Sequence, residues 1–198
     1  MEAVRVDGRS GRSVRTREKI ILALFDLIRE GNLRPRGEEI AERAEVAVRT
    51  LFRHFDDMES LFASAQAIVS ERMDVEGPLP DVRGDLEERC RAYATEQAGI
   101  FAENRNYLLF YTARVRTEAE ANAIRSASAK TARLRLWSAL PECAAAPPPI
   151  RRAVEELFSF QSWDQLRFEQ SLSHQDAVET IVFSAHLLLK AASPPSGA

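Results

Sequence analysis

The spacing of apolar residues is the feature that most constrains the fold of this 198-residue chain. Apolar side chains recur at intervals of three and four along almost every segment, and strict alternation of apolar and polar residues is absent. Ala, Leu, Glu and Arg, which favour helices, dominate over β-branched residues. The pattern predicts an all-α protein of about nine helices and no strand.

Composition excludes several classes of protein. With 45% apolar and 29% charged residues, the chain can bury the core of one compact domain or two small ones. It has no uncharged apolar run of about eighteen residues, the length of a membrane helix. The charged N-terminus lacks the pattern of a signal peptide, so we expect a cytoplasmic protein with no membrane partner. Cys90 and Cys143 stand outside any C-x-x-C pair, which predicts reduced thiols.

Charge is distributed unevenly along the chain. The first 55 residues hold 12 Lys and Arg against 9 Asp and Glu, whereas the remainder holds 15 against 21. A basic N-terminal third on an acidic body can meet an anionic partner with one end only. Ordinary surface charge is the alternative interpretation.

Breaks in the helical pattern divide the chain into segments. We expect a flexible basic arm over residues 1–13, a helix-turn-helix domain over 14–62, a helical domain over 63–192 and a disordered tail over 193–198. The helix expected at 58–73 links the two domains. Helices are expected at about 16–30, 38–44, 48–55, 58–73, 85–103, 106–114, 118–140, 150–170 and 174–192, with a proline-rich loop at 141–149.

A spaced set of residues over 16–62 carries a family resemblance. Its members are Gly31, Ile40 with Ala41, Ala44 with Val46, the run Thr50-Leu51-Phe52-Arg53-His54-Phe55, and Leu61. This segment resembles the N-terminal domain of the TetR family of bacterial transcriptional regulators. The resemblance implies a DNA-binding repressor with a palindromic operator, a helical body that binds a small effector, and a homodimer held by the last two helices.

The helix expected at 48–55 is the candidate for reading DNA. Val48, Leu51 and Phe55 lie three or four apart, which predicts that they form its buried face. The candidate DNA-binding residues are Arg36, Ala47, Val48, Arg49, Thr50, Phe52, Arg53 and His54. Five arginines of the arm either add contacts to DNA or belong to a solubilising tail: Arg5, Arg9, Arg12, Arg15 and Arg17.

Several positions depart from the usual family pattern. Glu45 replaces a glycine of the turn and would be strained in a left-handed backbone, and Ala47 replaces a capping serine. Phe52, Met58 and the pair Arg36-Gly37 also depart from it. These changes predict weakened DNA affinity. They leave an alternative function open, which is a helical ligand-binding or protein-interaction module without sequence-specific DNA binding.

Aromatic residues of the helical domain are candidates for lining an effector site, or else for ordinary core. The effector-binding candidates are Gln97, Phe101, Tyr107, Phe110, Tyr111, Arg114 and Trp137, with Trp163 and His186 as further material. Such a lining predicts an apolar, planar effector. The candidate dimer-interface residues are Trp163, Leu166, Phe183, Leu187 and Leu188.

Catalytic motifs are missing from the sequence. His54, His174 and His186 are scattered, and the chain has no H-x-x-E-H string, Gly-x-Ser-x-Gly string or Gly-rich phosphate loop. We therefore expect no enzyme activity, no cofactor and no metal site.

Overall fold

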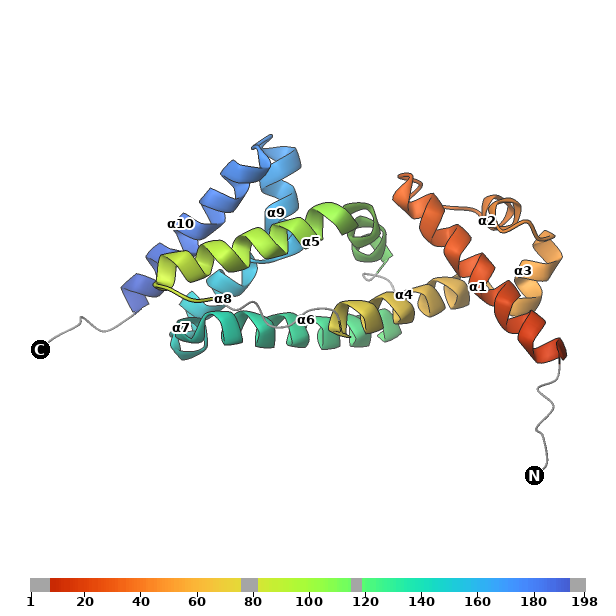
Figure 1. The fold of residues 1–198 in the computed structure, drawn as a ribbon, viewed down its shortest axis with the longest axis horizontal. Coiled ribbons are helices and arrows are strands. Elements are labelled where there is room, and N and C mark those ends of the chain that lie inside the picture. Colours follow the sequence, from red (N-terminus) through yellow and green to blue (C-terminus); the bar gives the residue numbers. More distant parts are fainter. Residues whose placement is uncertain (1–7, 76–81, 115–118, 193–198) are drawn as a thin grey trace, which may run out of the picture. The chain divides into compact units, whose positions relative to one another are not determined.

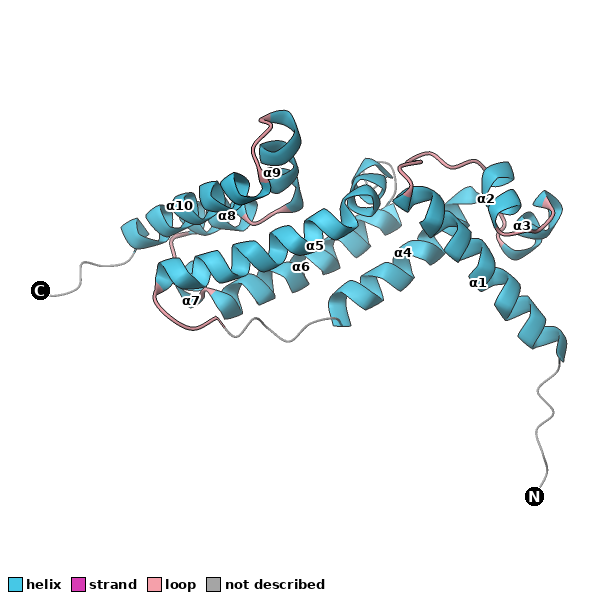
Figure 2. Cartoon of the chain, turned by 45° about the horizontal axis from the view of Figure 1, so that its top comes forward, coloured by secondary structure: helices cyan, strands magenta, loops and turns pink. Residues whose placement is uncertain are grey.

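The fold is all-helical, as the apolar spacing predicted. A computed structural model describes residues 8–75, 82–114 and 119–192, and within these ranges it contains ten α-helices, one π-helical turn and no strand (Figures 1 and 2). No helix within the described ranges is long and apolar enough to cross a lipid bilayer. The chain forms two compact units, one of residues 1–74 and 106–122 and the other of residues 75–105 and 123–198.

The first unit holds four N-terminal helices: α1 (Gly8–Arg29), α2 (Gly37–Arg43), α3 (Val48–His54) and α4 (Met58–Val75). The bounds of α2, α3 and α4 agree closely with the expected ranges. The first helix is longer than expected because it begins at Gly8. Residues 8–13 are therefore helical and do not belong to a flexible arm; residues 1–7 and 193–198 lie outside the described residues.

An apolar core joins the helices of the first unit. The expected stripe on α1 is buried, with Ile20 and Leu24 at 0% exposure, and it packs in one cluster with Leu51 of α3. Phe110, from the C-terminal part of α5 (Leu86–Arg114), belongs to the same cluster and meets Phe62 edge-on at 5.3 Å between ring centroids. The expected division at residue 62 is therefore wrong, since residues 63–74 and 106–122 also belong to this unit.

The second unit holds most of α5 and the remaining helices. These are α6 (Ala119–Ala139), α7 (Pro141–Ala145), α8 (Pro148–Leu157), α9 (Phe160–Asp164), the π-helical turn η1 (Gln165–Glu169) and α10 (His174–Ala192). α10 packs against α8, and Val154, Trp163 and Leu189 are among the fully buried side chains of this unit.

Helix boundaries in the second unit differ from expectation at three places. The two helices expected at 85–103 and 106–114 are one continuous α5, in which Asn104 donates a side-chain hydrogen bond to the Ile100 carbonyl at 2.9 Å. Two helices, α7 and α8, begin within the segment 141–149 that was expected to be a loop. Each has a proline in its first turn, where a backbone N–H has no partner within the helix, so the N–H that proline lacks is not missed. The helix expected at 150–170 is interrupted at Ser159, whose hydroxyl accepts from the Ser162 N–H and caps α9.

Candidate nucleic-acid interface

The exposed face of α3 presents charged and aromatic side chains on a helix anchored from behind. Leu51 is 0% and Phe55 is 3% exposed, and Val48 packs partly buried against the same core, as the spacing predicted. Arg49 and Arg53 are exposed on the outer side. The helix therefore offers two guanidinium groups to a partner while its apolar side is held by the first unit.

The remaining sequence candidates lie around this helix. Arg36 is exposed immediately before α2, where its backbone N–H donates to the Glu39 carboxylate at 2.6 Å. Thr50 and His54 are half-buried on α3. The expected set thus belongs to one helix-turn-helix segment, between residues 36 and 54.

The turn between α2 and α3 has an unusual backbone at Glu45. Its φ is 54°, in the left-handed region. This conformation was expected from the glycine that the family pattern has at this position. A side chain in this region costs about 1–2 kcal/mol relative to a right-handed conformation. The Glu45 carboxylate lies 3.2 Å from Nζ of Lys19 on α1, in an exposed ion pair. Such a pair contributes little, so it offsets only part of the strain.

α3 also begins without a side-chain cap. Ala47 is the N-cap residue, with φ −69° and ψ 145°, and no side chain accepts a hydrogen bond there. The first turn of α3 holds no acidic residue that would favour its dipole. The N-terminal end of this helix is therefore held by its buried face and by backbone hydrogen bonds alone.

Two other departures from the family pattern fit each other. A Cβ placed on Gly37 would stand 3.3 Å from Cζ of Phe52, tighter than an ordinary contact. The glycine at the start of α2 therefore leaves room for the phenyl ring of α3, which is 44% exposed.

Arg17 was expected in the basic arm but takes a different place. Its Nη1 donates to the carbonyl of His54 at 2.9 Å and its Nη2 donates to Oγ of Ser64 at 2.7 Å. Its guanidinium also lies 4.2 Å from the centroid of the Phe55 ring. Helical spacing places Arg17 on the side of α1 that carries Ile20, three positions further on, but it does not identify these partners.

The electrostatics at the end of α3 affect His54. Partial burial, together with the charges of Arg53 and Arg17, lowers the pKa of His54 below its ordinary value of 6.5. The imidazole is therefore mainly neutral at pH 7, and it adds no full positive charge to this surface.

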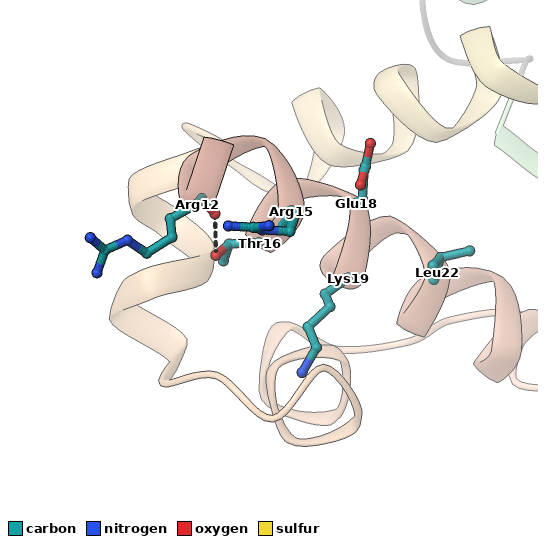
Figure 3. A pocket seen from close by; sticks show the side chains of 6 residues that line it. All are labelled: Arg12, Arg15, Thr16, Glu18, Lys19 and Leu22. Carbon is teal, nitrogen blue, oxygen red and sulfur yellow. Dashed lines mark hydrogen bonds between the residues drawn. The ribbon is translucent and has the colours of Figure 1, made fainter. Parts of the chain in front are cut away.

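The outer face of α1 carries an open hollow of about 450 Å³ (Figure 3). It is lined by Arg12, Arg15, Thr16, Glu18, Lys19 and Leu22. Three of these side chains are cationic, and Lys19 connects this face to the turn before α3 through Glu45. Arg5 lies outside the described residues, as does the side chain of Arg9.

The effector candidates are distributed between the two units. Tyr107, Phe110 and Tyr111 lie in the part of α5 that belongs to the first unit, and Tyr107 meets Phe25 at 6.1 Å. Gln97, Phe101 and Trp137 lie in the second unit, together with His186. Phe101 packs against Phe160 and Trp163, whereas Trp137 donates to the Glu155 carboxylate at 3.1 Å. The side chain of Arg114 lies outside the described residues.

The dimer candidates separate into surface and core residues. Phe183 is 71% and Leu187 is 58% exposed on α10, while Leu166 and Leu188 are partly exposed. The placement of Trp163 at an interface is wrong, because its side chain is 1% exposed and packs inside the chain against Phe101, Phe160 and Phe168.

The helix-turn-helix segment of this chain matches a known protein family. Residues 37–65, which span α2, the turn, α3 and the start of α4, match the model of the family described as bacterial regulatory proteins, tetR family. A comparison with curated protein sequences gives no match.

Solved structures resemble the chain over nearly its whole length. A transcriptional regulator from Rhodococcus sp. Rha1 superposes with a TM-score of 0.67 at 19% identity, over 90% of this chain and 99% of that one. A TetR transcriptional regulator from Rhodococcus sp. RHA1 superposes with a TM-score of 0.53 at 21% identity, over 90% and 99%. At these identities the likeness shows a shared fold. The chain therefore shares its fold with these two regulators, and its helix-turn-helix segment is similar to that of the tetR family of bacterial regulatory proteins.

Proposed function

We propose that the protein is a homodimeric transcriptional repressor that binds a palindromic double-stranded operator through α3 of each subunit. The observation that carries the proposal is the exposed pair Arg49 and Arg53 on a helix whose opposite side is buried. Arginine can donate two hydrogen bonds to a guanine edge, and a residue near the start of a recognition helix is best placed for this contact. We assign base reading to Arg49 and Thr50, and phosphate contact to Arg53.

The cationic face of α1 supports a role in phosphate binding. Arg12, Arg15 and Lys19 follow one another at helical spacing along the hollow of Figure 3. The contact between Lys19 and Glu45 shows that this face borders the turn that precedes α3. Phosphate contacts from α1 would orient the unit on the duplex without reading sequence.

The test is selection of bound duplexes from a random library by the purified protein, at low salt and again at about 150 mM. We expect an enriched palindrome, because a two-fold symmetric dimer presents two inverted copies of α3. Arg49→Ala should weaken binding to that palindrome by about 1–3 kcal/mol. Arg152→Ala, which removes an exposed arginine from α8, is the matched control. No enrichment by a folded dimer would refute the proposal.

We propose a small, apolar and planar effector that binds the helical body and releases the protein from DNA. The aromatic content around Phe101 supports this class of ligand. The chain has two tryptophans, so a ligand screen can follow intrinsic fluorescence. Hits drawn only from hydrophilic compounds would contradict the proposed ligand class.

A second candidate function is a helical ligand-binding or interaction module that has lost sequence-specific DNA binding. The strained Glu45 and the uncapped Ala47 favour it, since both weaken the start of α3 and Glu45 adds a negative charge to the surface. Salt dependence separates the two candidates. Counterion release makes the affinity of a DNA-binding protein fall steeply as salt rises, and a ligand-binding module has no such dependence on duplex DNA.

A further inference from the structure

Arg17 joins three elements of the first unit through one side chain. From α1 its guanidinium reaches the last carbonyl of α3, the hydroxyl of Ser64 on α4 and the face of Phe55, the residue that follows α3.

These contacts can hold the C-terminal end of α3 in place. The last four carbonyls of a helix lack intrahelical donors, and a cation there also opposes the negative end of the helix dipole. The planar guanidinium can serve two acceptors at fixed angles. Ser64 is itself oriented, because its hydroxyl donates to the Ser60 carbonyl at 2.7 Å and therefore turns a lone pair toward Arg17.

The opposite end of α3 makes this fixation more important. Ala47 supplies no cap, and Glu45 holds the preceding turn in a strained conformation. Because α3 has only 7 residues and no N-terminal cap, its orientation depends on contacts at its C-terminal end. We propose that Arg17 is a positioning residue for operator recognition, which holds α3 at the angle needed for base contact and does not itself contact DNA. This inference rests on the proposed DNA-binding function.

The experiment compares Arg17→Gln with Arg15→Gln, which removes an exposed arginine from the hollow two residues away. Affinity is measured for the selected operator and for a scrambled duplex over a range of salt. For Arg17→Gln we expect operator affinity to fall about tenfold or more, the scale of one lost base contact, with scrambled-duplex affinity and salt slope unchanged. For Arg15→Gln we expect both affinities to fall and the salt slope to decrease by about 0.9.

Three results would overturn the inference. A loss of about 0.9 in the salt slope of Arg17→Gln would make Arg17 a phosphate contact. Unchanged affinities would make it a residue of structural stability only. Failure of the wild-type protein to select any operator would refute the proposed function, and the inference with it.

Ser64→Ala provides an independent test if Arg17→Gln does not fold. Alanine favours helix more than serine does, so α4 should not be destabilised by this change. We expect a loss of operator affinity of about threefold, a part of the full effect, again with scrambled-duplex affinity unchanged. Amide hydrogen exchange without DNA should be faster in α3 of this variant and unchanged in α2. Wild-type exchange and wild-type operator affinity would overturn the inference without affecting the proposed function.

Discussion

Glu45 combines two costs at one residue, a left-handed backbone and a carboxylate beside the surface proposed to meet phosphates. Glycine removes both, and a serine at position 47 restores a cap worth about 1 kcal/mol. We expect the double variant Glu45→Gly with Ala47→Ser to bind the selected operator about tenfold more tightly. The measurement is a titration of labelled operator at fixed salt.

The control for that titration is Glu169→Gln, which removes an exposed carboxylate from the second unit. It should leave operator affinity unchanged. Equal affinity of the double variant and the wild-type protein would show that the turn does not limit DNA binding.

Cys90 and Cys143 are free, and both are fully buried. Burial raises the pKa of Cys90 to about 12 and that of Cys143 to about 11, so neither forms an appreciable thiolate at neutral pH. We expect no reaction of the folded protein with an aromatic disulfide reagent at pH 8, and reaction of two thiols after unfolding in urea. Rapid labelling of either thiol in the folded protein would contradict the burial.

At the scale of elements, an ion pair joins α7 to α5. Glu142 of α7 accepts from both terminal nitrogens of Arg89, one of them at 3.0 Å, and the hydrogen bond and charge of Arg89 lower the pKa of Glu142 below 4.5. Because the pKa is lowered in the folded state, the stabilisation is present above pH 4.5 and is lost as pH falls below it.

Glu142→Gln tests this ion pair. Allowing for solvent screening of a partly exposed pair, we expect a loss of about 1 kcal/mol in the free energy of unfolding at pH 7. The difference from wild type should shrink as pH falls below 4.5, since the wild-type carboxyl then becomes protonated. Urea unfolding at a series of pH values provides the measurement, and a difference that does not change with pH would contradict the assignment.

The elements that sequence predicted best are those with both a repeated apolar pattern and a clear stop signal. α10 was predicted at its observed bounds, and α3 to within one residue, because the apolar spacing starts and ends sharply there. The short helices α7 and α9 were missed because their formation depends on prolines at a first turn and on the Ser159 cap. Five residues give too little periodicity to detect.

The candidate site also has features that could be predicted from sequence and features that could not. The exposed and buried faces of α3 follow from helical spacing alone. The contacts of Arg17 do not, because its partners lie 37 and 47 residues further along the chain and are set by packing of α3 and α4 against α1. Trp163 was misplaced for a similar reason, since a large apolar side chain on a helix fits a core and an interface equally well in sequence.

At the scale of the whole molecule, the proposed dimer depends on the uncovered apolar face of α10. Phe183 and Leu187 are one helical turn apart and mostly exposed, whereas Ala185 between them and Ile181 before them are buried. Leu187→Glu would place a charge within the proposed interface, where an unpaired charge costs several kcal/mol. We expect this variant to sediment as a monomer.

The matched control for the dimer is Leu134→Glu, which introduces the same charge at another exposed leucine, on α6. It should sediment as the wild-type protein does. A Leu187→Glu variant that keeps the wild-type sedimentation coefficient would refute the placement of the interface on α10.

The first unit is discontinuous along the chain, and this affects the order in which the protein can fold during synthesis. Residues 1–74 leave the ribosome without Phe110, whose ring completes their core, and without Asn106, whose amide donates to the Arg29 carbonyl at the end of α1. The nascent N-terminal helices therefore expose part of their apolar surface until translation has passed residue 110. A fragment that ends after α4 would keep α3 and lose the contact between Phe62 and Phe110 that completes the core of the unit.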